Sequence, residues 1–158
     1  IFIVELICKK AKTLGKQRLQ EIADFIELHY DAPDYLKPSA DDLITSNLHA
    51  IVAIKDLGAG QVVPVGVSFF ELITPNLVKT RTTVVHTKHR GQGIGSNIKK
   101  FMESEVKKMG VTKVATNSYV DNLPSPIVNL KHGYLVEGLL RDHDEVGKHE
   151  YILSKVLV

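Results

Sequence analysis

The sequence of 158 residues has no tryptophan, a single cysteine and charges that nearly cancel. One thiol, Cys8, cannot form an internal disulfide, which excludes a disulfide-stabilised scaffold and favours a reducing, cytoplasmic setting. The net charge of +2, with no run of Lys or Arg longer than a pair, argues against nucleic acid as a partner. The length and the 44% hydrophobic content fit one globular domain over residues 1–158.

Long apolar runs and metal-binding patterns are also missing. Segment 1–8 is apolar but too short to span a membrane, and no cleavage signal follows it, so we expect no membrane partner. The chain does not begin with methionine, and we therefore expect its natural N-terminus to be missing or replaced. The seven histidines show no paired spacing typical of metal ligands, so we expect no metal.

Apolar periodicity and the positions of Gly and Pro predict the order β-α-α-β-β-β-α-β-α-β-β. The predicted strands cover about 1–8, 49–55, 62–73, 77–86, 111–118, 134–141 and 149–158, and the predicted helices 12–29, 39–46, 93–109 and a segment around 127–132. Ser39 is expected to cap the second helix and Gly110 to end the third, while Pro64 and Gly66 predict a bulge. The order predicts an α/β fold in which an open mixed sheet has helices on both faces.

The segment Arg90-Gly91-Gln92-Gly93-Ile94-Gly95, here called the anion turn, is the most informative motif. It follows an apolar run typical of a strand and opens a strongly periodic helix. Glycines leave no Cβ in the way, so backbone N–H groups can converge on a ligand. The start of a helix adds unpaired donors and the positive end of the helix dipole. The segment therefore predicts a binding site for a phosphate-like anion.

The element order and the anion turn resemble the GNAT superfamily of acetyl-CoA-dependent N-acetyltransferases. The signature of this superfamily, Arg/Gln-x-x-Gly-x-Gly/Ala, is matched by Arg90, Gly93 and Gly95. A second match is Asn122, expected to cap the last helix, with Gly133-Tyr134 about twelve residues further on. The resemblance covers residues 48–158 well and the N-terminal third by element order only.

The resemblance implies a mostly antiparallel sheet in which the fourth and fifth strands splay apart. It also implies that acetyl-CoA is the cosubstrate and that its diphosphate lies on the anion turn. The pantetheine arm would pair with the fourth strand, as an added strand does. The residues expected to bind the coenzyme are Thr83, Val84, Val85, Arg90, Gly91, Gln92, Gly93, Ile94, Gly95, Ser96, Asn122 and Asn129.

The groups expected at the reaction centre are also implied by the resemblance. The Val85 N–H is the expected oxyanion donor, and relatives place a Tyr acid where this chain has Asn129. Asn can donate a hydrogen bond but no proton to a thiolate, so Asn129 would position the sulfur, and Tyr119 or water could be the acid. No Glu occupies the fourth strand, which leaves Glu71 and His86 as the candidate bases.

The resemblance implies an enzyme that transfers an acetyl group from acetyl-CoA to a primary amine by direct attack in a ternary complex. The acid-rich segments 29–35 and 142–145 predict a cationic acceptor, such as a lysine side chain, a protein N-terminus or a small amine. The alternative is a non-catalytic acyl-CoA-binding regulatory module, which Asn129 and the missing Glu favour. A homodimer that pairs exposed C-terminal strands is a further option.

Overall fold

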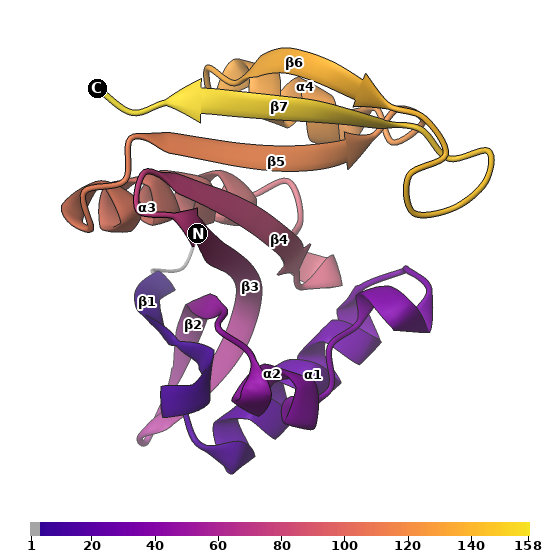
Figure 1. The fold of residues 1–158 in the computed structure, drawn as a ribbon. Helices are drawn as coiled ribbons and strands as arrows, with labels where there is room; N and C mark the ends of the chain where they lie inside the picture. The colour runs from indigo at the N-terminus through magenta and orange to yellow at the C-terminus, as the bar shows by residue number, and fades with distance from the viewer. Residues whose placement is uncertain (1–3) are drawn as a thin grey trace. The chain divides into compact units, whose positions relative to one another are not determined.

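The computed structural model describes residues 4–158, and the first three residues of the strand expected at 1–8 lie outside this range. The elements follow the predicted order (Figure 1). They are β1 (Val4–Lys10), η1 (Ala11–Thr13), α1 (Lys16–His29), η2 (Asp34–Leu36), α2 (Ala40–Thr45), β2 (His49–Gly58), β3 (Gln61–Thr74), β4 (Leu77–Val85), η3 (Thr87–His89), α3 (Ile94–Lys108), β5 (Lys113–Tyr119), α4 (Pro124–Lys131), β6 (Leu135–Leu140) and β7 (Glu150–Val156).

The strands form a seven-stranded mixed sheet in the order β1-β2-β3-β4-β5-β7-β6. The pairs β1–β2, β2–β3, β5–β7 and β6–β7 are antiparallel, whereas β4 and β5 are parallel. The parallel pairing joins Leu77–Lys79 to Lys113–Ala115 and stops there, although β4 continues to Val85 and β5 to Tyr119. The mixed sheet and the separation of its fourth and fifth strands are therefore confirmed.

Two compact units divide the chain. The N-terminal unit contains the residues up to Glu71 together with Arg81–Glu105, and the C-terminal unit contains Leu72–Thr80 and Val106–Val158. β3, β4 and α3 contribute to both units. Each unit has buried apolar side chains of its own.

Helices cover both faces of the strands in the N-terminal unit. On one face, α1 and α2 bury a cluster against alternate residues of β2 and β3. On the other face, a Cβ added at Gly66 of β3 would stand within 3.0 Å of Ile94 and Ile98 of α3. The cluster under α1 and α2 comprises Ala11, Leu19, Ile22, Phe25, Ile26, Ala40, Leu43, Ala50, Val52, Ile54, Val67, Phe69 and Val84.

The ends of the first two helices depend on local signals. α1 begins at Lys16, not at Lys12 as predicted, because Gly15 with a φ of 84° precedes it and residues 11–13 form a 3-10 turn. Ser39 caps α2 as predicted, in a capping box with Asp42. The backbone N–H and the hydroxyl of Ser39 both donate to the Asp42 carboxylate and lower its pKa.

The predicted bulge lies in the β2–β3 pair. Ala53 pairs with Gly66 and Ile54 with Pro64, so Val65 is the extra residue of β3. Proline has no backbone N–H to donate to the hydrogen-bond ladder between the strands. The bulge interrupts the ladder there, so no such donor is needed at Pro64. The prediction from Pro64 and Gly66 is therefore confirmed.

Two details of the second half differ from prediction. Leu123, not Asn122, is the N-cap of α4; Asn122 is exposed, and its backbone carbonyl accepts the N–H of Ser125. Pro124 at the first helical position explains this start, since it needs no partner for an N–H. Met109, the last residue of the predicted helix 93–109, is 43% exposed, because α3 ends at Lys108 before the positive-φ residue Gly110.

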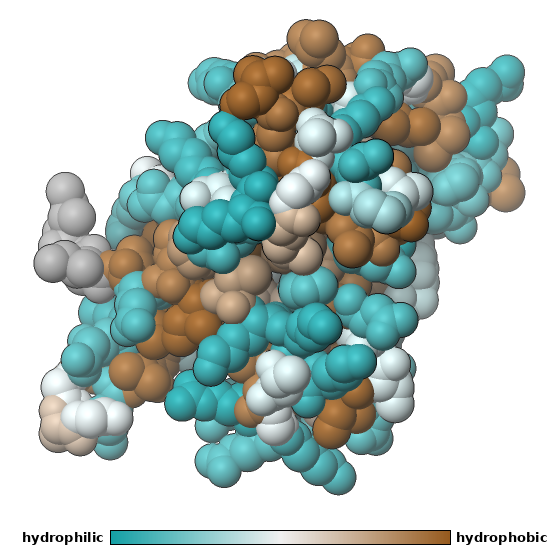
Figure 2. All heavy atoms as spheres, turned by 60° about the vertical axis from the view of Figure 1, so that its left-hand side comes forward, coloured by the Kyte–Doolittle hydropathy of each residue, from teal (hydrophilic) through white to brown (hydrophobic). Residues whose placement is uncertain are grey.

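β6, rather than the C-terminal strand, is the edge of the sheet. β7 is paired with β5 on one side and β6 on the other, so the expected free edge on the C-terminal strand is wrong. Apolar surface gathers at the top of Figure 2, where Figure 1 places β6 and α4. Leu135 and Leu139 of β6 and Leu130 of α4 are among the exposed apolar residues. Within residues 4–158, no helix combines the length and apolar character needed to cross a bilayer.

Candidate active site

The anion turn connects η3 to α3 within the N-terminal unit. Gly91 and Gly93 have φ values of 76° and 84°, in the left-handed region that favours glycine. A Cβ added at either residue would have no described atom within 4 Å, so the space beside both is open. α3 starts at Ile94 and runs for 15 residues, which directs the N–H groups of its first turn and its positive end toward the turn. These residues fit a bound diphosphate.

Gly95 has a different local environment. It lies in the first turn of α3, and a Cβ added there would stand 3.7 Å from Cγ2 of Val85, an ordinary contact. Alanine is therefore sterically acceptable at this position, as the Gly/Ala choice in the signature implies.

Arg90 has a structural role that the sequence did not reveal. Its Nη2 donates to the backbone carbonyl of His29 at 2.6 Å, and its Nε donates to the carbonyl of Val85 at 3.3 Å. The guanidinium thus ties the last residue of α1 to the end of β4, next to the anion turn. Its contact with a phosphate remains a prediction.

Three histidine rings pack against one another at tilted angles beside the end of β4. The ring centroids of His29 and His86 are 4.0 Å apart, and those of His86 and His89 are 4.9 Å apart. Burial lowers the pKa of His29, with a further contribution from the Arg90 charge. Burial also lowers the pKa of His86, followed by the charges of His29, His89 and Lys88. His29 and His86 are therefore neutral at neutral pH.

Both expected bases are already engaged. The backbone N–H of Lys88 donates to Nδ1 of His86 at 3.1 Å, which places the proton of the neutral ring on Nε2. His86 therefore presents a donor rather than a lone pair at its other nitrogen. Arg81 Nη2 donates to the Glu71 carboxylate at 2.6 Å, so this carboxylate is held in an ion pair. Their roles as bases stay predictions, but neither environment favours them.

The buried neutral histidines make stability dependent on pH. The folded pKa of His29 lies below its ordinary value of 6.5, so the unfolded chain binds more protons at lower pH. The contribution of His29 to the free energy of unfolding is expected to be fully present above pH 6.5 and to be lost as the pH falls below that value. Urea unfolding between pH 7.5 and 5 measures this dependence. In a His29→Asn variant the free energy of unfolding should change less with pH than in wild type. An identical slope in both proteins would contradict the assignment.

The side chains of Thr83 and Val84 on β4 have partners within the protein, so the backbone is the part of these residues that is predicted to bind the coenzyme. Thr83 Oγ1 lies 2.7 Å from Ser68 Oγ of β3, and the Val84 side chain is 2% exposed within the core.

Cys8 is half-buried on β1, and burial with the nearby Glu105 raises the pKa of its thiol to about 11. A thiol with that pKa is protonated at neutral pH, which makes Cys8 a packed residue rather than a nucleophile.

Asn122 and Asn129 belong to the C-terminal unit, whereas the anion turn belongs to the N-terminal unit. The Asn129 side chain is 5% exposed, and its Nδ2 donates to Ser118 Oγ at 3.2 Å, which ties α4 to β5. Its Oδ1 is buried and has no hydrogen-bond partner among the described residues. The coenzyme contacts of both residues remain predictions.

Sequence reasoning missed Glu150, the first residue of β7. This side chain is 5% exposed, and Asn117 Nδ2 donates to its Oε1 at 3.5 Å. Burial raises its pKa, and the Asp144 charge raises it further. Glu150 follows a polar loop and starts a short strand, so no local signal distinguished it from a solvated carboxylate.

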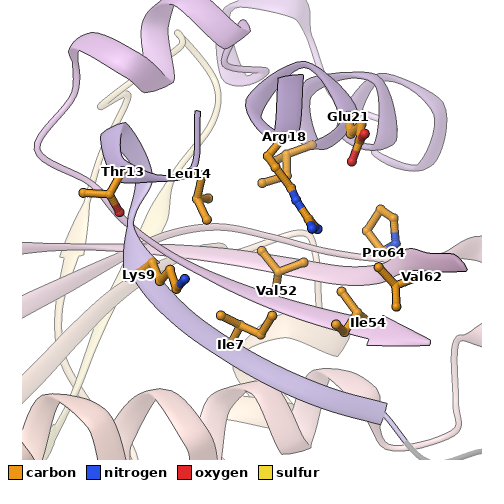
Figure 3. A pocket seen from close by; sticks show the side chains of 11 residues that line it. Ile7, Lys9, Thr13, Leu14, Arg18, Glu21, Val52, Ile54, Val62 and Pro64 are labelled. Atoms are coloured by element: carbon orange, nitrogen blue, oxygen red, sulfur yellow. The ribbon is translucent and has the colours of Figure 1, made fainter. Parts of the chain in front are cut away.

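A separate cavity of about 220 Å³ lies between α1 and strands β1 to β3 in the N-terminal unit (Figure 3). Its floor is apolar, and Arg18 extends over it from α1. None of the predicted site residues lines it. The lining residues are Ile7, Lys9, Thr13, Leu14, Arg18, Glu21, Ile22, Val52, Ile54, Val62 and Pro64.

Comparison with known proteins settles the family. The sequence model of the acetyltransferase (GNAT) family matches residues 10–134. The chain belongs to this family. The activity of this GNAT protein is accordingly acetyl-CoA-dependent acyl transfer. No sequence among curated proteins matches it significantly.

Solved structures share the fold at low sequence identity. A GNAT-family protein from Desulfovibrio desulfuricans is 13% identical over 99% of this chain and 100% of its own, with a TM-score of 0.79. An aminoglycoside 6'-N-acetyltransferase complexed with coenzyme A is 14% identical over 96% and 97%, with a TM-score of 0.73. The ribosomal-protein-S18-alanine N-acetyltransferase from Escherichia coli is 11% identical over 96% and 94%, with a TM-score of 0.74.

Proposed function

We propose that this GNAT protein is an N-acetyltransferase that transfers the acetyl group of acetyl-CoA to a primary amine. The observation that carries the proposal is the anion turn, where Gly91 and Gly93 leave open space at the start of α3. Main-chain donors there hold the coenzyme diphosphate, and the exposed backbone at the end of β4 receives the pantetheine arm.

The reaction proceeds by direct attack of the amine in a ternary complex. The neutral amine attacks the acetyl carbonyl, and the Val85 N–H stabilises the oxygen as it becomes negative. A single positioned donor of this kind lowers the barrier by about 3 kcal/mol. The departing thiolate takes a proton from Tyr119 or from water, because Asn129 can donate only a hydrogen bond.

The acceptor is a cationic amine. Two acid-rich segments of the chain support this. They contain Asp31 and Asp34 after α1, and Asp142, Asp144 and Glu145 between β6 and β7. The two named enzymes of the same fold, at 14% and 11% identity, are N-acetyltransferases, which is compatible with an amine acceptor.

Thiol release from acetyl-CoA tests the function directly. With purified protein, release is expected to accelerate when a primary alkylamine or a peptide with a free N-terminus is added, and not with a carboxylate such as butyrate. Tight binding of coenzyme A without turnover on any amine would instead support the non-catalytic acyl-CoA-binding module.

A further inference from the structure

The carboxylates of Asp144 and Glu150 lie close together in the C-terminal unit, beside the His143 ring. Ligand atoms of His143, Asp144 and Glu150 all lie within 4.8 Å of one another. Oε2 of Glu150 is buried and has no hydrogen-bond partner among the described residues, and the whole side chain is 5% exposed. Ionised carboxylates can only accept hydrogen bonds, so this arrangement requires a proton or a cation.

An ammonium group meets this requirement. Hydrogen bonds of about 2.9 Å at the tetrahedral angle place two acceptors about 4.7 Å apart around one ammonium nitrogen. The cluster is no wider than about that distance. Asp144 and His143 are exposed while Glu150 is buried, so a cation can enter from the loop and reach the buried oxygen.

The position of Glu150 on the sheet links the cluster to the acid proposed above. In the β5–β7 register Glu150 stands opposite Tyr119. Alternation places Asn117 and Tyr119 on one face of β5 and Ser118 on the other. Ser118 lies on the face toward α4, where Asn129 contacts it. Glu150, bonded to Asn117, is therefore on the face opposite α4, together with Tyr119.

We propose that the Glu150 carboxylate binds the ammonium group of the acceptor and accepts its proton, with Asp144 as a second anchor. This inference rests on the proposed function and offers a base other than Glu71 and His86, whose environments do not favour that role. The proton passes from the ammonium nitrogen to Oε2 of Glu150, and the nitrogen keeps the electron pair. That pair forms the N–C bond to the acetyl carbonyl carbon as the C–S bond breaks. The nitrogen then loses a second proton, which replaces the one that Tyr119 or water gives to the departing thiolate.

The environment of Glu150 suits proton transfer. Burial and the neighbouring Asp144 charge raise the pKa of Glu150. The Glu150 carboxylate is therefore a stronger base than an ordinary carboxylate, and its pKa is closer to that of an amine. The groups that face it are Asp144 and His143 from the loop and Asn117 from β5, of which His143 and Asn117 favour the ionised form.

A pair of amines separates proton acceptance from a structural role. Butylamine is an ammonium ion at neutral pH, whereas p-anisidine is already neutral. For Glu150→Gln, kcat/KM with butylamine should fall about 100-fold or more, with a lower kcat. The loss with p-anisidine should stay within about tenfold, because no ammonium proton must be removed first. Coenzyme A should raise Tm equally in variant and wild type.

Two further variants keep the test sharp. Asp144→Asn is a change at an exposed residue and leaves the core intact. It should lower kcat/KM for butylamine only about tenfold, less than Glu150→Gln does, because solvent screens the Asp144 charge. Glu137→Gln, an exposed carboxylate on β6 outside the cluster, should leave kcat/KM unchanged. Equal losses with both amines, or full activity of Glu150→Gln on butylamine, would overturn the proposal.

Direct binding distinguishes failure of this inference from failure of the proposed function. Butylammonium should shift the NMR signal of the Asn117 side-chain amide in wild type and not in Glu150→Gln, even if no amine is acetylated. An absent shift overturns the inference. A rise in Tm with Mn²⁺ or Zn²⁺ that requires Glu150, without a butylammonium shift, would assign the cluster to a metal instead.

Discussion

Gly93→Asp is expected to weaken coenzyme A binding by at least about 100-fold, which corresponds to about 2.7 kcal/mol. The new Cβ would enter the open space beside the start of α3, where the diphosphate is proposed to lie. The carboxylate would also compete for the same backbone donors and repel the phosphate charges. The φ of 84° adds backbone strain, although Asp tolerates this region better than most residues.

Gly60→Asp is the matched control. Gly60 lies in the β2–β3 hairpin with a φ of 74° and no described atom within 4 Å of an added Cβ. The variant therefore experiences similar backbone strain and the same charge change away from the anion turn. Calorimetric titration should show wild-type affinity for coenzyme A in Gly60→Asp. Equal affinities of the two variants would show that the anion turn does not hold the diphosphate.

Features set by neighbouring residues were predictable from the sequence. The element order follows from apolar periodicity. This pattern shows which face of a segment is buried, and it does not depend on which other element covers that face. The capping box at Ser39, the bulge at Pro64 and the end of α3 at Gly110 each depend on a few adjacent side chains or on a φ angle. The anion turn was found for the same reason, because its glycines and the following helix are contiguous.

Features set by distant residues were not predictable. The hydrogen bond from Arg90 to the His29 carbonyl joins residues 61 apart in the chain. The burial of Glu150 arises because β7 pairs on both sides, with β5 and β6. The proton position on His86 depends on a backbone N–H whose direction only the folded turn defines. Asn122 failed as a cap for a local reason, since Pro124 moved the helix start.

Gly66→Val is expected to lower the free energy of unfolding by about 3 kcal/mol. A Cβ at this position would stand 2.8 Å from Cδ1 of Ile98 and 3.0 Å from Cγ2 of Ile94, both closer than normal contacts. Cδ1 of Ile98 is the end of a flexible side chain and can move, but Cγ2 of Ile94 is fixed close to its helix. The two methyl groups of valine leave α3 no low-energy way to keep its position against β3.

A second substitution tests this cause. Ile98→Val removes the Cδ1 atom that would collide and should cost about 1 kcal/mol alone. In Gly66→Val/Ile98→Val the combined loss should be smaller than the sum of the single losses by about 1 kcal/mol, because the two changes share one space. Gly138→Val on β6, where an added Cβ meets only Ile152 Cδ1 at 3.9 Å, should change the urea midpoint little. Additive losses in the double variant would show that Gly66 is required for a reason other than the close approach of α3.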